Sequence, residues 1–327
     1  MVLKTFSGPV KREALMEEAP YRIEYQPQLV EESVLRAIAG HSDERLFRKE
    51  RNRLYELEDA EAREAAFHDL HTRWFKRLGL GRTFQQALEY WPILQTSTHK
   101  CLLVPARSKK DVCAEMYVAP KNSALAERQR RSVVIQVTTE LLCRPQQLLS
   151  FLRHELLHIV DMLDPDFGYE PNLPESEIGP TYDRFLQERY RVLWDITIDG
   201  RLHQKGWLPD SVREQHWAVF RNTFPGPTEG LEPVFSFFFD GLVPTHQELL
   251  SFCRAPESWL EEADTAFNPK GRCSLCRFPS HQLIDAPAIL VPGLIDKIQK
   301  AHPQWRPTQP ICRQCADLYE LRLDTYV

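Results

Sequence analysis

Apolar residues recur at helical spacing over most of this chain, so the sequence predicts a mainly helical protein. The pattern is helical from Val30 to about Leu94 and again from Tyr182 to Gln204. Between Pro145 and Pro165, leucine, isoleucine and valine return every three or four residues, and Pro145 suits a first helical turn because its missing N–H costs nothing there. We therefore expect one long helix that begins at Pro145 and ends before Pro165.

Three short apolar segments predict strands, and the last of them directly precedes the long helix: Cys101–Val104, Ala114–Val118 and Ser132–Thr138. The last strand is either a sheet edge that pairs with an extended substrate or an interior strand without substrate contact. The expected fold class is α+β, with a mostly helical core and a small sheet. We expect a helical N-terminal region over residues 1–95, which starts with an irregular arm to residue 30, a core over 96–265 and a small module over 266–327.

Composition narrows the class of protein. The chain has 327 residues, of which 43% are hydrophobic, and this is enough to fill one large core or two. A formal charge of -5 is mild, so a dedicated nucleic-acid or membrane-surface binder is not expected; a net charge of this size is compatible with a local basic patch. No segment approaches the roughly 18 apolar residues of a membrane span, and we expect a cytoplasmic protein.

The long helix carries the first chemical motif, His154-Glu155-Leu156-Leu157-His158, an instance of HExxH. Residues four apart lie on one helix face with Cβ atoms roughly 5–6 Å apart, so His154 and His158 can offer two imidazoles to one metal ion. Glu155 lies beside that face. Its carboxylate can accept the proton of a zinc-bound water and pass it to a leaving amine, the general-base role in metal-assisted hydrolysis.

A catalytic zinc usually takes three protein ligands and keeps a fourth position open for water. Asp161 is seven residues past His154, about 10.5 Å along the helix axis, which is too far to close the site. It suits a role in orienting a ligand or a polar helix end. The Tyr182–Gln204 helix offers Asp195 and Asp199, four residues apart, so that one can bind zinc while the other orients an imidazole. His203 and Glu188 are further alternatives on the same helix.

HELLH on a helix that follows a strand resembles the zincin metallopeptidases. The segment from Trp194 to His203 resembles that of predicted bacterial metallopeptidases in which HExxH is followed by a helix with the pattern W-N-x-A-x-D-x-x-I-N. Aligned on Trp194, the matching aspartate is Asp199. The chain departs from the pattern at four positions, where it has Asp195, Thr197, Leu202 and His203.

The resemblance covers roughly residues 130–205. It implies a zincin-like core, a catalytic zinc held by His154, His158 and Asp199, and a peptide or protein substrate. HExxH together with a C-terminal zinc module also resembles the SprT-like proteases that act on protein crosslinked to DNA. That family places a histidine ligand soon after HExxH, whereas this chain has no histidine between His158 and His203.

The C-terminal end carries a second metal motif. Two CxxC pairs, Cys273/Cys276 and Cys312/Cys315, can supply four thiolates to a structural zinc in a closed tetrahedron. A helical pattern follows the second pair, as in zinc ribbons and treble clefs. Such modules stabilise small folds or bind other macromolecules, and a protein partner is favoured here over nucleic acid.

The sequence therefore predicts a zinc-dependent metallopeptidase with one catalytic and one structural zinc, in which Glu155 activates the zinc-bound water. A non-catalytic zinc protein, a scaffold or regulator, is the alternative from another class.

Overall fold

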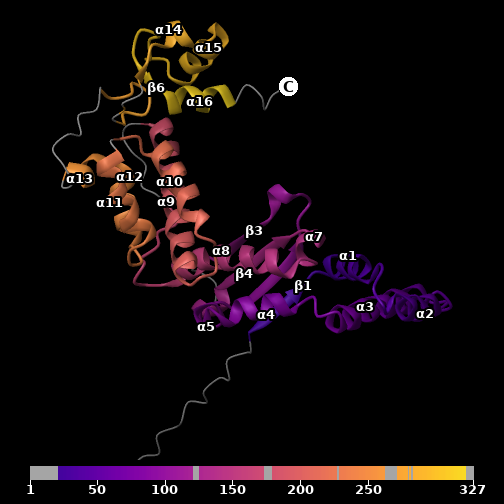
Figure 1. The fold of residues 1–327 in the computed structure, drawn as a ribbon. Helices are drawn as coiled ribbons and strands as arrows, with labels where there is room; N and C mark the ends of the chain where they lie inside the picture. Colours follow the sequence, from indigo (N-terminus) through magenta and orange to yellow (C-terminus); the bar gives the residue numbers. More distant parts are fainter. Residues whose placement is uncertain are drawn as a thin grey trace, which may run out of the picture. The chain divides into compact units, whose positions relative to one another are not determined.

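The computed structural model describes residues 21–120, 125–172, 179–226, 228–261, 271–278, 280 and 283–321. It is a mixed α+β structure that is mostly helical, as the sequence predicts (Figure 1). Two compact units divide the chain: Met1–Leu78 with Gln95–Thr139, and Gly79–Leu94 with Glu140–Val327. The junctions between these units follow Leu78, Leu94 and Thr139. The three domains expected over residues 1–95, 96–265 and 266–327 stay a prediction.

The first unit joins N-terminal helices to a four-stranded sheet. Its elements are β1 (Arg22–Tyr25), α1 (Pro27–Ile38), α2 (Glu44–Leu54), α3 (Ala60–Arg77), β2 (Lys100–Pro105), the 3-10 helix η1 (Lys109–Asp111), β3 (Cys113–Val118), α6 (Glu127–Arg130) and β4 (Arg131–Val137). The three predicted strands correspond to β2, β3 and β4. The prediction of an irregular arm up to residue 30 is wrong in part, because Arg22–Tyr25 forms a strand. Residues 1–20 of that arm lie outside the described residues.

The sheet has the order β1-β2-β4-β3, in which β1, β2 and β4 run parallel and β3 runs antiparallel to β4. On β4, Val133, Ile135 and Val137 alternate into the core and are buried. Because β4 is hydrogen-bonded to a strand on each side, the interior alternative for Ser132–Thr138 is confirmed. The alternative prediction, that this strand is a sheet edge that pairs with a substrate, is wrong, because an interior strand has no free backbone groups for a peptide.

The second unit is helical. Its elements are α4 (Arg82–Glu89), α8 (Pro145–Leu163), α9 (Pro180–Gln204), α10 (Ser211–Thr223), α11 (Thr228–Phe239), α12 (His246–Arg254), α13 (Pro256–Glu261), β5 (Leu283–Ile284), α14 (Ala286–Ile289), α15 (Pro292–Ala301), β6 (Ile311–Cys312) and α16 (Arg313–Leu321). Two short helices, α5 (Pro92–Ser97) and α7 (Thr139–Leu142), span the junctions between the units. Among the described helices, none combines the length and apolar character that crossing a membrane requires.

The helix α9 is the central helix of the second unit, because α8, α10, α11 and α12 all pack against it (Figure 1). Its apolar side chains join a core with the buried phenylalanines of α10 to α12, among them Phe235 and Phe239. The N-terminal part of α9 also contacts the four-cysteine module, through Phe185 in the module's core and Tyr182, whose ring stacks on Phe278 at 4.6 Å. One helix therefore links the long α8 helix to the C-terminal module.

Gly200 lets α9 and α11 approach closely. A Cβ at Gly200 would lie 2.1 Å from the backbone oxygen of Phe239, so no larger residue fits without backbone movement. We predict that Gly200→Ala lowers the free energy of unfolding by about 1–3 kcal/mol through overpacking, measured by urea denaturation. Gly293→Ala is the control, because a Cβ there meets no atom within 4 Å. Equal stability of both variants would contradict this close contact.

Candidate metal centres

The first centre lies where α8 faces α9. His154 and His158 are one helical turn apart on α8, with ring centroids 5.0 Å apart. From α9, Asp195 places Oδ1 3.1 Å from His158 Nε2 and 4.0 Å from His154 Nε2. One ligand atom from each of these three residues lies within 4.8 Å of the other two. The structure thus brings together a His/His/Asp group that can hold a metal ion.

The spacing of these atoms suits a small tetrahedral cation. Bonds of ~2.0–2.1 Å at tetrahedral angles put two ligand atoms ~3.3–3.4 Å apart, and the distances of 3.1 and 4.0 Å from Asp195 Oδ1 bracket that value. The side chains of His154 and Asp195 are 27% and 36% exposed. A cation held here would therefore remain accessible from solvent, as a catalytic metal must be.

Asp199 takes a different position from the ligand role predicted for it. Its Oδ1 accepts a hydrogen bond from His154 Nδ1 at 2.7 Å, and its Oδ2 accepts one from His216 Nε2 at 2.7 Å. Both oxygens thus face imidazole N–H groups. The bond to Nδ1 fixes the His154 tautomer that leaves Nε2 free to bind a metal. This geometry favours Asp195 as the third ligand and Asp199 as the residue that orients His154.

Electrostatics at this centre favour a positive charge. Burial lowers the pKa of His154, but the hydrogen bond and charge of Asp199, with the charges of Asp195 and Glu155, raise it above its ordinary value. Burial raises the pKa of Asp199, but the hydrogen bonds and charges of His154 and His216 hold it well below its usual range. Carboxylates surround the two imidazoles, and the group attracts a cation.

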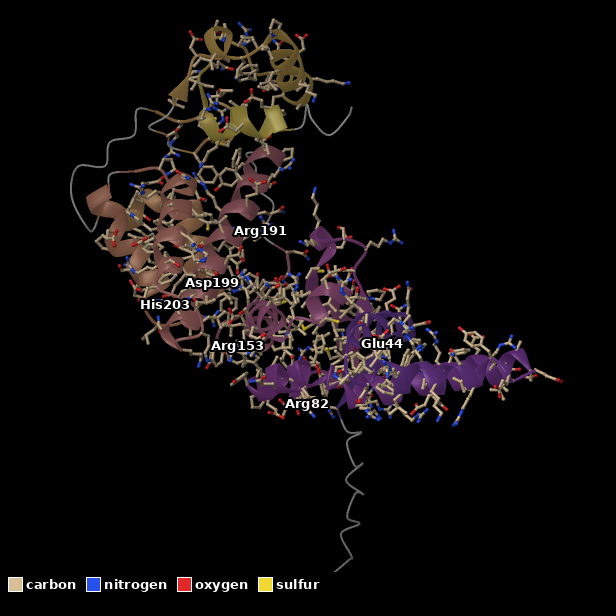
Figure 2. All side chains as sticks on the ribbon, turned by 45° about the vertical axis from the view of Figure 1, so that its right-hand side comes forward. Glu44, Arg82, Arg153, Arg191, Asp199 and His203 are labelled. Atoms are coloured by element: carbon tan, nitrogen blue, oxygen red, sulfur yellow. The ribbon has the colours of Figure 1, made fainter. Side chains whose placement is uncertain are left out.

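The other residues considered for this site lie as follows. Figure 2 shows Asp199 and His203 in succession along α9, but His203 Nε2 pairs with Asp210 Oδ1 at 3.1 Å. Glu188 pairs with Arg184 at 3.7 Å. Neither residue belongs to the His/His/Asp group. His216 was not predicted, because it comes from α10 and no sequence motif connects it to Asp199.

Asp161 ties α8 to α9. This carboxylate is 2% exposed and accepts hydrogen bonds from Arg201 Nη1 and Nη2 at 2.7 and 2.6 Å, and from Trp194 Nε1 at 2.8 Å. The Trp194 ring in turn lies edge-on to His158 at 4.5 Å. Asp161 therefore contacts the site indirectly, through Trp194. The orienting role expected of it from the sequence stays a prediction.

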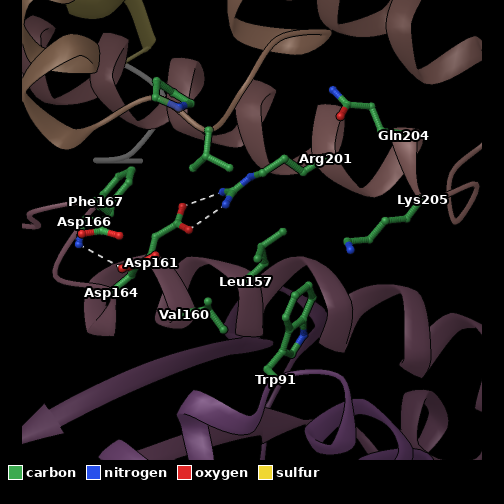
Figure 3. Close-up of a pocket in the computed structure, with 12 residues that line it drawn as sticks. Trp91, Leu157, Val160, Asp161, Asp164, Asp166, Phe167, Arg201, Gln204 and Lys205 are labelled. Atoms are coloured by element: carbon green, nitrogen blue, oxygen red, sulfur yellow. Dashed lines mark hydrogen bonds and ion pairs between the residues drawn. The ribbon is translucent and has the colours of Figure 1, made fainter.

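A cavity of about 670 Å³ opens beside this ion pair (Figure 3). Asp161, Arg201 and Lys205 supply charge to its wall, and Trp91 and Phe167 supply aromatic surface. His154, His158 and Asp195 do not line it. The cavity is thus separate from the first metal centre, although both border the contact between α8 and α9.

The second centre is the four-cysteine cluster, which is buried. The Sγ atoms of Cys273 and Cys315 are 3.6 Å apart, and those of Cys276 and Cys312 are 3.8 Å apart. Zinc–sulfur bonds of ~2.3 Å place tetrahedral sulfurs ~3.8 Å apart, whereas a disulfide needs ~2.05 Å. The four thiols are free cysteines at the separation of metal ligands.

The backbone around the cluster supports this role. Cys312 N–H donates to Cys273 Sγ at 3.2 Å and Cys315 N–H donates to Cys312 Sγ at 3.4 Å, bonds that favour thiolates. Arg277 adopts φ 62°, and its N–H closes a turn onto the Cys273 carbonyl at 2.9 Å. One cysteine pair lies in this turn, while the other lies at β6 and the first turn of α16. The cluster can therefore hold a metal ion, as the two CxxC pairs of the sequence predict.

The chain was compared with known proteins. It matches no family model, and it has no significant match among curated proteins or solved structures. The function is therefore argued from the residues of the two centres.

The ion pair between Asp161 and Arg201, called the Asp161 clamp below, leads to a prediction about stability. Asp161→Ala leaves the half-buried Arg201 guanidinium, whose side chain is 13% exposed, without its carboxylate. Removal of one partner of a buried pair costs about 3–5 kcal/mol. We expect a loss of that size in the free energy of unfolding, measured in urea. Asp166→Ala, at an exposed position of the following loop, is the control and should change it by less than about 0.5 kcal/mol. A loss below about 1 kcal/mol for Asp161→Ala would contradict the clamp.

Proposed function

We propose that this protein is a zinc-dependent metallopeptidase. The observation that carries the proposal is the convergence of His154 and His158 of HELLH with Asp195 from a second helix, in a partly exposed group whose ligand atoms lie within 4.8 Å of one another. The sequence context supports it, since Glu155 lies next to the first histidine on the same helix. The substrate class is a peptide or protein.

Each residue has a role in this proposal. His154, His158 and Asp195 hold the metal, and Asp199, itself held by His216, orients His154. When bound, zinc acts as a Lewis acid that lowers the pKa of water and polarises the scissile carbonyl. The Glu155 carboxylate accepts the proton of the attacking water and donates it to the leaving amine nitrogen. Glu155 is close enough for its charge to act on His154.

The four cysteines hold a structural zinc in the same proposal. All four are buried, so their site is closed and offers no position for a substrate. The module then stabilises the C-terminal end of the second unit, where it packs against α9 through Phe185. The protein partner expected from the sequence would bind through this module.

We predict about two zinc ions per chain in protein purified without added metal. The double variant His154→Ala, His158→Ala should hold about one, because the four-cysteine site is independent of α8 ligands. The measurement is zinc per chain by mass spectrometry. An unchanged count would mean that HELLH binds no zinc and would favour a non-catalytic protein.

Two further variants distinguish the third ligand in the same measurement. Asp195→Ala should lose the HELLH zinc, whereas Asp199→Asn should keep it with an affinity reduced by about 10–100-fold, the usual effect of removing an orienting partner. His203→Ala is the control and should retain both ions. If Asp199→Asn loses this zinc ion and Asp195→Ala keeps it, then Asp199 is the third ligand, as the sequence predicts.

Glu155→Gln tests catalysis. The variant keeps the size of the side chain but cannot accept a proton, so hydrolysis should fall by about 10²–10⁴-fold while zinc content and thermal stability stay the same. The assay is cleavage of a proteome-derived peptide library, read by mass spectrometry, with the zinc-loaded wild type as reference. Equal cleavage by the variant would refute the mechanism. A wild type that holds two zinc ions but cleaves nothing, with or without added DNA, would favour a scaffold or regulator.

A further inference from the structure

A buried arginine lies against the four-cysteine module, and among the described residues it forms no salt bridge with a carboxylate. Arg189 of α9 is 4% exposed, and its Nε and Nη1 atoms have no hydrogen-bond partner among the described residues. Its guanidinium lies 3.9 Å from the ring centroid of Phe278 and 5.4 Å from that of Phe224. A buried, unpaired charge costs several kcal/mol, so this arginine calls for an explanation.

The surroundings identify the source of negative charge. Burial lowers the pKa of Arg189, and this is opposed by the charges of Cys276, Cys253, Cys312 and Glu257, in that order. Glu257 makes the smallest contribution of the four; its Oε1 lies 3.6 Å from Arg272, and its Oε2 is buried without a hydrogen-bond partner among the described residues. Cys276 and Cys312 belong to the metal cluster, and Phe278 follows Cys276 by two residues. Two of the four groups that favour the charged guanidinium, including the first, are therefore thiols of the module, and the contact of Arg189 with Phe278 places the guanidinium beside that module.

The net charge of the module depends on metal. Four thiolates and one divalent cation sum to a charge of -2, whereas four thiols without metal are neutral. In a buried environment such a dianion is stable only with hydrogen bonds or positive charge nearby. Arg189 is a permanent cation in this position, because guanidinium does not lose its proton in proteins.

We infer that Arg189 is the counter-cation of the four-thiolate metal site, which it stabilises by charge while Phe278 and Phe224 hold its guanidinium in place. The inference rests on the proposed structural zinc. It gives α9 a role in both centres, since the same helix supplies Asp195 and Asp199 to the first. It also explains why an arginine is buried where an apolar residue would fit the aromatic surroundings.

The inference makes opposite predictions for the metal-free and metal-bound protein. Arg189→Met removes the charge but keeps apolar volume, so zinc affinity at the cysteines should fall by about 10–100-fold. The stability of the reduced, metal-free protein should not fall, because a lone buried charge has been removed. Arg189→Lys keeps the charge and should retain most of the affinity. Arg191→Met, an exposed position on the same helix, is the matched control (Figure 2).

The affinity is measured by titration with Co²⁺ and competition with Zn²⁺. The thiolate-to-cobalt charge-transfer band reports the four-cysteine site alone, because His154, His158 and Asp195 supply no sulfur. Urea denaturation with chelator and reductant gives the metal-free stability. If Arg189→Met binds as tightly as wild type and both forms lose stability equally, Arg189 has only a packing role and the inference is wrong. A wild type without the band would refute the four-cysteine metal site itself.

Discussion

The bidentate pair between Asp161 and Arg201 is the interaction on which the rest of the second unit depends. It fixes α8 against α9 with two hydrogen bonds of 2.7 and 2.6 Å in a buried position, and Trp194 adds a third. A planar guanidinium and a carboxylate tolerate little sliding when both bonds form. The clamp therefore sets the register in which His154 and His158 meet Asp195 and Asp199.

This register explains how the two aspartates came to have different positions. Residues four apart on α9 both face α8, but His154 and His158 are also four apart, so each aspartate meets a different part of the imidazole pair. Asp195 lies on the Nε2 side, where a metal would bind, and Asp199 lies on the Nδ1 side, where a hydrogen bond selects the tautomer. In the proposed site, one helical repeat of α9 thus supplies both the third ligand, Asp195, and the residue that orients His154, Asp199.

The sequence was most informative where the chemistry is local. The helix over Pro145–Leu163, the strands β2 to β4 and the spacing of both CxxC pairs follow from periodicity and short motifs. The choice between Asp195 and Asp199 depends on the crossing of two helices, which periodicity does not determine. His216 and Arg189 were missed for the same reason, because their partners lie on other elements and neither belongs to a motif.

The edge or interior position of a strand is equally nonlocal. The apolar composition of Ser132–Thr138 fits an edge strand and an interior strand equally. Its position is interior because β2 pairs with it in parallel on one side and β3 pairs with it antiparallel on the other. Composition also failed at β1, where a segment between prolines pairs with β2. In each case, tertiary pairing supplies the hydrogen bonds that make a short, weakly patterned segment a strand, and its own residues carry only part of that information.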